Sequence, residues 1–276
     1  MSTQQLFYEN VTPVSPQRHG NLSVQSGAYF EFARKVNSVP LMALEIPAAA
    51  REYSIVFAPA GDSVMPVVVL GVEGHDNLYV SGDGGWDGTY VPAFVRRFPF
   101  VFSRSDDEST FTLCVDESWT GCNEDGQGER LFNDDGERTQ YLQNVLNFLE
   151  EYQAQFQRTQ AFCNRLRELD LLEEMKAEFA LAGGEQRTLT GFQAINRDRL
   201  KALPPETLGE LTRSDELELI YIHLQSMNNF TAMLNKVREA HDPSPETKAE
   251  SEVAEKETPE TEAKPKTSKS AKKTKT

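Results

Sequence analysis

The sequence is short of several features that would assign a protein class directly. It has three cysteines in 276 residues and no C-x-x-C pair, so we expect neither a disulfide framework nor a cysteine zinc site. We expect Cys114, Cys122 and Cys163 to be free thiols in a reducing compartment. No stretch approaches the roughly 18 uncharged apolar residues of a membrane-spanning helix, and the longest run, residues 64–72, has the length of a strand.

Positive charge is also scarce. The chain has 43 Asp and Glu against 28 Lys and Arg, for a formal net charge of −15. An acidic surface repels nucleic acid and anionic lipid, so we expect no nucleic-acid partner for the folded part. Residues 242–276 contain no aromatic residue and one β-branched aliphatic, Val253, which predicts a disordered tail. We expect one α+β domain over residues 1–241, β-rich over 1–132 and mainly helical over 133–241.

The N-terminal residues lack the basic start and apolar run of a secretory signal peptide. We therefore expect a cytoplasmic location. The alternative is the cell surface, reached by a route that needs no signal peptide.

Short runs rich in Val, Ile, Phe and Tyr, each bounded by Gly, Pro, Asp or Asn, predict a mostly antiparallel sheet through about residue 116. The predicted strands cover residues 53–59, 65–72, 77–80, 98–104 and 110–116. Between residues 137 and 169, apolar residues recur at three and four positions, which predicts amphipathic helix with a break near Thr159.

A further change of period follows this helical region. Alternation from Met175 onward and the pair Gly183-Gly184 predict a β-hairpin set between helices. Asn196 and the prolines at 204 and 205 are expected to begin two short helices. Ser214 is expected to cap a last helix that runs to about residue 240 and is deeply buried over its first half. The fold class is therefore α+β.

The stretch GDGGWDG at residues 82–88 has the composition of a ligand-binding loop but matches no known motif. Its glycine spacing differs from that of a dinucleotide-binding loop, and the chain has no Gly-Lys-Ser/Thr for a P-loop. A calcium loop that starts at Asp83 would place Phe94 where a bidentate carboxylate is required, and a second partial match from Asn123 has no preceding helix. We expect no metal and no cofactor, and a corner built on glycine is the simplest interpretation.

Four side chains in and after this loop remain candidates for ligand binding. Trp86, Tyr90, Arg96 and Arg97 combine aromatic faces with guanidinium groups, which suit an anion or a carbohydrate. In the alternative, the arginines neutralise the acidic run at residues 106–135 and Trp86 covers the core.

Catalytic motifs are absent from the sequence. There is no G-x-S-x-G and no H-E-x-x-H. Asp116 and Glu117 follow a predicted strand and could act as acid and base with His223. Adjacent strand residues point to opposite faces, however, and His223 sits on a helical face where a buried structural histidine is expected. Catalytic residues are therefore unknown.

A set of segments resembles, in order, the SapC family of bacterial proteins. The segments include VNSVPLMALEIPAAAREYSIVFA, PVVVLGVEGHDNLYV, GWDGTYVPAFVRRFPFVF, TQAFCNRLRELDLLEE, TLTGFQAINRDRLKALP and LELIYIHLQSM, and the resemblance extends from about residue 29 to residue 234. The segment after Leu172 lacks a proline seen in the family, and the Lys-rich tail is outside the pattern. The resemblance implies an association with bacterial surface layers. A permease role, which some names in the family suggest, is excluded by the missing membrane spans.

We therefore expect a non-enzymatic binding or assembly protein, linked to the surface layer or envelope, with a protein, small-molecule or glycan partner. The alternative is a cytoplasmic enzyme or accessory factor that acts on a peptide, a sugar or a cofactor-bound substrate. The resemblance implies no catalytic residues.

Overall fold

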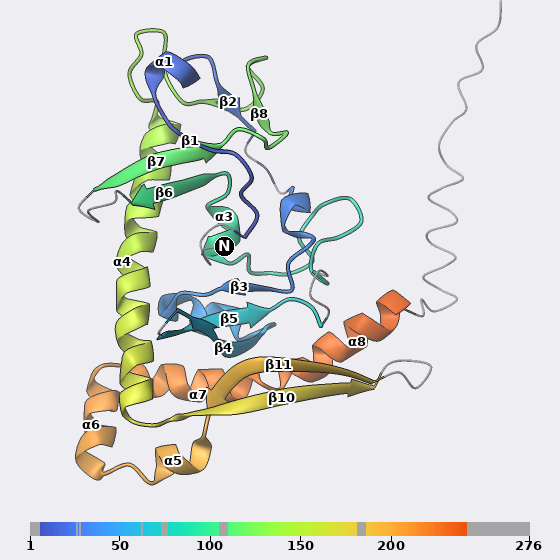
Figure 1. Cartoon of the computed structure of the whole chain (residues 1–276), viewed down its shortest axis with the longest axis vertical. Helices are drawn as coiled ribbons and strands as arrows, with labels where there is room; N and C mark the ends of the chain where they lie inside the picture. Colours follow the sequence, from blue (N-terminus) through green and yellow to red (C-terminus); the bar gives the residue numbers. More distant parts are fainter. Residues whose placement is uncertain are drawn as a thin grey trace, which may run out of the picture.

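The computed structural model describes residues 6–25, 27, 29–61, 63–72, 77–104, 110–180 and 186–241. The predicted disordered tail, 242–276, lies outside these residues, as does the tip of the predicted hairpin. Within the described part the chain has the predicted α+β fold, with antiparallel sheets, a long helix and a cluster of C-terminal helices (Figure 1).

The central sheet has five strands in the order β10-β11-β4-β5-β3. Its strands are β3 (Ser38–Pro40), β4 (Ser54–Ala60), β5 (Ser63–Val69), β10 (Leu172–Ala180) and β11 (Gln186–Ile195). The predicted hairpin is confirmed as β10–β11, and β11 joins β4 where Gln193 pairs with Phe57. The two halves of the sequence therefore share one sheet.

Two smaller sheets lie toward the other end of the molecule (Figure 1). One contains β1 (Val11–Pro13), β7 (Phe111–Asp116) and β6 (Phe100–Arg104); the other contains β8 (Cys122–Asn123), β2 (Ser23–Val24) and β9 (Glu129–Arg130). The strand predicted at residues 77–80 is wrong, because only Val80 pairs, in an isolated bridge with Trp86. The side-chain oxygen of Asn77 accepts the N–H of Tyr79 (2.9 Å), which turns the chain instead.

The long helix α4 (Gln140–Glu168) packs on β5, β6 and β9 and runs beside all of these sheets (Figure 1). Its N-cap is Thr139, whose hydroxyl accepts the N–H of Leu142 (3.3 Å). The break predicted near Thr159 is wrong. Thr159 is buried, and its hydroxyl donates to the carbonyl of Gln155 (2.8 Å) and accepts the N–H of Ala43 (2.9 Å). A tertiary contact therefore uses the hydroxyl that could have capped a second helix.

Four helices follow the hairpin: α5 (Arg197–Lys201), α6 (Pro205–Arg213), α7 (Glu216–Ser226) and α8 (Asn229–His241). The predicted starts of the first two are confirmed, since Asn196 caps α5 and Pro205 opens α6. Ser214 is not the cap of the last helix. It ends α6, and Asp215, with φ of 60°, precedes α7.

The single last helix predicted to reach residue 240 is instead two helices. The side-chain amide of Asn229, the first residue of α8, donates to the carbonyls of Ala50 and Tyr53 (2.8 Å each), which anchors a new helix start there. Burial of α7 is also less complete than predicted, because Ile220 is buried but the neighbouring Tyr221 is 44% exposed.

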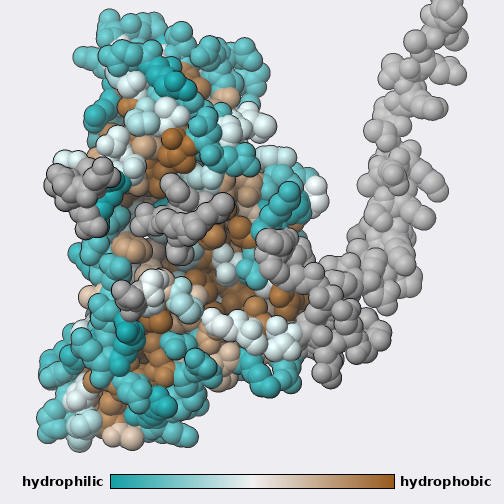
Figure 2. Space-filling view, viewed as in Figure 1, coloured by the Kyte–Doolittle hydropathy of each residue, from teal (hydrophilic) through white to brown (hydrophobic). Residues whose placement is uncertain are grey.

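Short helices complete the fold: α1 (Pro16–His19), α2 (Ile46–Ala49), α3 (Ala93–Arg96) and the 3-10 helices Glu31–Ala33 and Ala43–Glu45. The largest core cluster lies between the central sheet, α2, α4 and α7. On one face, apolar side chains gather along the middle of the molecule while hydrophilic ones cover both ends (Figure 2). None of the helices within the described residues combines the length and the apolar composition needed to cross a membrane.

Candidate functional site

The glycine-rich loop at residues 81–91 forms a corner whose polar groups bond largely to the protein itself. The indole N–H of Trp86 donates to the hydroxyl of Tyr53 (2.9 Å), which donates in turn to the carbonyl of Tyr90 (2.5 Å). The carboxylate of Glu52 accepts the backbone N–H of Tyr90 (2.6 Å). These bonds take up groups that would otherwise be offered to a ligand.

The loop also holds the segment of residues 29–34 in place. The carbonyl of Gly84 accepts the N–H of Phe30 (2.6 Å), and the ring of Trp86 packs against the ring of Phe30 at 5.5 Å between centroids. The guanidinium of Arg34 donates to two carbonyls at the start of the loop, at 3.0 and 2.6 Å. The loop is therefore a support for an aromatic segment that comes much earlier in the sequence.

That segment forms one wall of a groove of about 530 Å³. The other walls come from α3, from the start of β6, from the connection after β7 and from the first half of α4. We call it the aromatic groove, because eight aromatic side chains line it: Tyr29, Phe30, Phe32, Phe98, Phe100, Trp119, Tyr141 and Phe148.

The groove continues into a second hollow of about 510 Å³, with which it shares Gln25, Gly27, Tyr29 and Trp119. The rings are partly linked to one another, since Phe32 stacks on Phe98 at 4.0 Å and Phe98 meets Trp119 edge-on at 5.6 Å. Together the two hollows form an elongated, aromatic-lined depression.

The rings of Tyr29 and Trp119 at the edge of the groove pack directly against the backbone of two glycines, Gly84 and Gly121. A Cβ built on Gly84, which has φ of 82°, would overlap the ring of Tyr29, and one built on Gly121 would overlap the ring of Trp119. A side chain at either position would push a ring off the backbone on which it lies. Tyr29 is 50% exposed, so its ring is presented to solvent at the mouth of the groove.

The lining of the groove differs in charge from the rest of the molecule. Among the described residues that line the two hollows, there is no Asp or Glu, and the charged side chains are Arg96 and Arg97. The other polar side-chain groups are the amides of Gln25, Asn144 and Gln127, the hydroxyls of Thr120, Tyr29 and Tyr141, and the indole N–H of Trp119. In a chain with a net charge of −15, a depression lined without acids is a local reversal of the general charge.

The four predicted binding residues divide between the groove and its support. Arg96 is exposed and Arg97 is 4% exposed, although both line the groove. The guanidinium of Arg97 lies 4.1 Å from the ring centroid of Phe94 and is packed inward. Tyr90 lines a separate cavity of about 280 Å³ that it shares with Arg96. Trp86 lies behind the wall, under Phe30.

The residues considered for acid–base chemistry do not meet. Asp116, at the end of β7, is buried and accepts the backbone N–H groups of Glu9 (2.6 Å), Asn10 (3.2 Å) and Ser118 (3.0 Å). His223 lies on α7, near the opposite end of α4 (Figure 1). A carboxylate so fully used by backbone donors organises a loop rather than transferring protons.

Glu117 instead forms an ion pair with Arg18 and a hydrogen bond with His19, both on α1. Its carboxylate accepts both Nε and Nη2 of Arg18 (2.5 and 2.7 Å) and the Nε2–H of His19 (2.8 Å). The Arg18 hydrogen bonds hold the pKa of Glu117 near 2. The other ring nitrogen of His19 accepts the N–H of Ser15 (3.1 Å), so this histidine–carboxylate pair has no nitrogen left to act as a base.

His223 is an enclosed structural histidine. It is fully buried, its Nε2 accepts the N–H of Ile195 (3.2 Å), and its ring centroid lies 5.0 Å from that of Phe57. Burial lowers its pKa to about 4, which keeps the ring neutral at physiological pH. Within the described residues no group of three His, Cys, Asp or Glu is placed to hold a metal ion.

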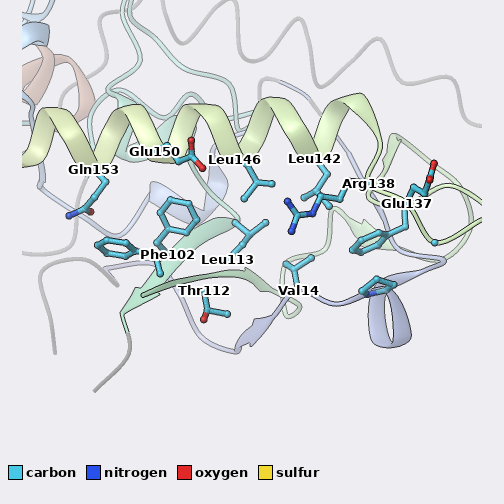
Figure 3. A pocket seen from close by; sticks show the side chains of 14 residues that line it. Val14, Phe102, Thr112, Leu113, Glu137, Arg138, Leu142, Leu146, Glu150 and Gln153 are labelled. Atoms are coloured by element: carbon cyan, nitrogen blue, oxygen red, sulfur yellow. The ribbon is translucent and has the colours of Figure 1, made fainter. Parts of the chain in front are cut away.

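A larger hollow, of about 820 Å³, lies between α4 and the β1-β7-β6 sheet (Figure 3). Leu142 and Leu146 of α4 face Phe102 and Leu113 across it, and Glu137, Arg138, Glu150 and Gln153 are placed around it (Figure 3). Its floor of leucine and phenylalanine side chains offers few hydrogen-bonding groups to orient a polar ligand, and its rim carries both signs of charge. The aromatic groove is therefore the stronger candidate site.

The comparisons with known proteins identify a family but no characterised relative. The family model described as SapC matches residues 14–233, which confirms the resemblance drawn from the sequence. No curated protein matches the chain, and no solved structure matches it.

Proposed function

This chain belongs to the SapC family, and we propose that it is a non-enzymatic binding protein whose aromatic groove holds a glycan chain of the bacterial envelope. The observation that carries the proposal is the lining of the groove: eight aromatic rings, amides and two arginines, with no Asp or Glu among the described lining residues.

The chemistry of sugars matches such a lining. A sugar ring has an apolar face of C–H groups, which packs on an aromatic ring, and an edge of hydroxyls, which needs hydrogen-bond partners. Tyr29 and Trp119 supply exposed or partly exposed rings, and Gln25, Asn144 and Gln127 supply amides. The continuation of the groove into the second hollow suits an extended chain of sugars better than a single compact molecule.

The alternative of an enzyme is less well supported. Asp116 and Glu117 are occupied by backbone donors and by Arg18 and His19, and His223 is enclosed by the core. A glycan polymer of the envelope lies at the cell surface, so this function favours the cell surface over the cytoplasm as the location of the chain. Fractionation of cells that produce the full chain would test that location.

The binding function is tested by replacing one ring of the groove. Tyr29→Ala should weaken binding to envelope polysaccharides about fivefold or more, because it removes an exposed stacking surface worth roughly 1 kcal/mol. The matched control is Tyr221→Ala, since Tyr221 is a similarly exposed tyrosine, at 44%, on α7. Binding would be measured on an array of neutral and acidic bacterial oligosaccharides, followed by calorimetry on those retained.

Both variants should melt at nearly the same temperature as the parent chain, because each removes a half-exposed side chain. If the parent chain binds no oligosaccharide on the array, or if Tyr221→Ala weakens binding as much as Tyr29→Ala, the proposal is wrong.

A further inference from the structure

Arg96, the last residue of α3, has a fixed guanidinium beside the aromatic groove. Its Nε–H donates to the carbonyl of Val91 (3.0 Å), and its central carbon lies 5.4 Å from the ring centroid of Phe148 on α4. The flat guanidinium is therefore held between a carbonyl and an aromatic face rather than extended into solvent. Arg96 nonetheless remains exposed.

Tyr90 and Glu45 fix this arginine from the side. The hydroxyl of Tyr90 donates to Glu45 Oε1 (2.6 Å), and Tyr90, Glu45 and Arg96 line one small cavity. Glu45 is itself buried and accepts the N–H groups of Ala93 (2.7 Å) and Met42 (2.9 Å). These neighbours, together with Val91 and Phe148, limit the positions that the Arg96 guanidinium can take.

The charge of Arg96 is not neutralised by the protein. Arg96 forms no ion pair within the described part of the chain. Glu45 is turned toward backbone donors, and Glu151 lines the small cavity on the other side of Arg96 without pairing with it. Unlike Arg96, the neighbouring Arg97 is packed among aromatic rings. An exposed cation held in place beside an acid-free groove is suited to an anionic ligand group.

We infer that the aromatic groove selects acidic glycans, and that a sugar carboxylate binds the guanidinium of Arg96 while neighbouring sugar rings stack on the groove. This inference rests on the proposed function. A single carboxylate fits better than a phosphate monoester or a highly charged chain, because one exposed arginine balances one negative charge and the acidic surface beyond the groove repels any excess.

The test compares sugars that differ only in charge. Oligosaccharides that contain uronic acids would be arrayed beside their methyl esters, which keep the rings and linkages but lose the carboxylate charge. The parent chain should bind the acid about tenfold more tightly than the ester, because the free energy of a charge-assisted hydrogen bond corresponds to at least about a tenfold change in affinity. The preference should weaken when salt is raised from about 0.05 M to about 0.5 M, because the charges are near solvent.

Arg96→Gln should make the acid and the ester bind about equally, because it removes the charge that distinguishes them. Arg104→Gln is the matched control. Arg104 lies on β6, away from the groove; it is also exposed, and its central guanidinium carbon lies 5.3 Å from the ring centroid of Phe111. It should retain the preference. Arg96→Lys should retain part of it, because lysine keeps the charge but not the planar fork.

The results separate the inference from the function beneath it. Equal binding of acid and ester by the parent chain, or a preference that survives Arg96→Gln, would overturn the inference. In either case, binding of the ester that depends on Tyr29 would leave the glycan-binding function standing. Binding of neither sugar class would overturn both.

Tyr90 is a positioning residue in this arrangement. Tyr90→Phe keeps the ring but removes the hydroxyl that bonds to Glu45 in the cavity shared with Arg96. We expect a reduced ratio of acid to ester affinity, with the ester affinity itself unchanged. A purely structural role for Tyr90 would weaken both sugars alike, and that result would contradict the role assigned here.

Discussion

The glycine-rich loop and the aromatic groove are neighbours, but they use their side chains in opposite ways. The loop residues Trp86 and Tyr90 make hydrogen bonds to Tyr53 and Glu52 within the protein. In the groove, Tyr29 is half exposed and Trp119 is partly exposed, and Arg96 keeps an unneutralised charge. A loop rich in residue types found at binding sites can thus use its polar groups in internal hydrogen bonds. The binding site then forms on the neighbouring segment that the loop holds in place.

The same distinction applies to the acid–base candidates. Asp116, Glu117 and His223 are residue types common in active sites, yet each is taken up by contacts that organise the fold. Like the side chains of the loop, these three residues stabilise the fold instead of facing a ligand. That assignment predicts that the titration of Glu117 and of His223 will change stability and leave glycan binding to the groove unaffected.

The largest expected effect is the pH dependence that His223 gives to stability. Its pKa is about 4 in the folded chain, against about 6.5 for a histidine in an unfolded chain, so between these values the unfolded chain binds the proton more readily. The stabilisation is complete above about pH 6.5 and is lost as the pH falls toward 4, by about 3 kcal/mol. Urea unfolding at several pH values across this window would measure it.

His223→Gln isolates this contribution, because glutamine offers an acceptor to Ile195 N–H but does not titrate. The slope between pH 6.5 and 4 should become shallower in the variant. The contribution of Glu117 falls in a lower window, from about pH 4.5 down to about 2, because its folded pKa is depressed. An unchanged slope in His223→Gln would show that the histidine is protonated in the folded state.

Disruption of the loop's internal bonds should have the next largest effect. Tyr53 is fully buried, and its hydroxyl serves both Trp86 and Tyr90. Tyr53→Phe should lower the free energy of unfolding by about 2 kcal/mol, because it leaves an indole N–H and a carbonyl without their partner. Tyr221→Phe, at an exposed tyrosine, is the control and should be neutral. A large loss of glycan affinity without a loss of stability would place Tyr53 in the site instead.

Much of the fold could be predicted from the sequence because it follows from local patterns. The alternation of β10–β11, the apolar periodicity of α4 and the cap at Asn196 each act through neighbouring residues. Two of the errors, at Thr159 and at Asn229, arose where a distant contact decided the outcome. Thr159 binds the amide of Ala43, and Asn229 binds carbonyls of residues 50 and 53, and no local pattern contains those partners.

The groove could be predicted only in part for a similar reason. Arg96 and Arg97 are identical neighbours in the sequence, yet one is exposed and the other packed inward. Tyr29 and Trp119 gave no signal beyond being aromatic residues close to glycines in polar segments. They are 90 positions apart in the sequence, and only the fold places them around one groove.

The smallest effect on stability, and the sharpest test of the comparison, comes from Gly84→Ala. Gly84 is part of the loop, but the ring of Tyr29 in the groove packs against its backbone. Alanine at φ of 82° should cost about 1 kcal/mol of strain, and its Cβ would overlap the Tyr29 ring. The half-exposed ring can swing away, so the overlap should displace Tyr29 rather than unfold the chain.

Gly82→Ala is the control, because a Cβ there meets nothing within 4 Å and its φ is not in the left-handed region. We therefore expect Gly84→Ala to lower glycan affinity as much as Tyr29→Ala does, with a melting temperature only slightly reduced, and Gly82→Ala to change neither. Full glycan affinity in Gly84→Ala would mean that the loop and the groove are independent.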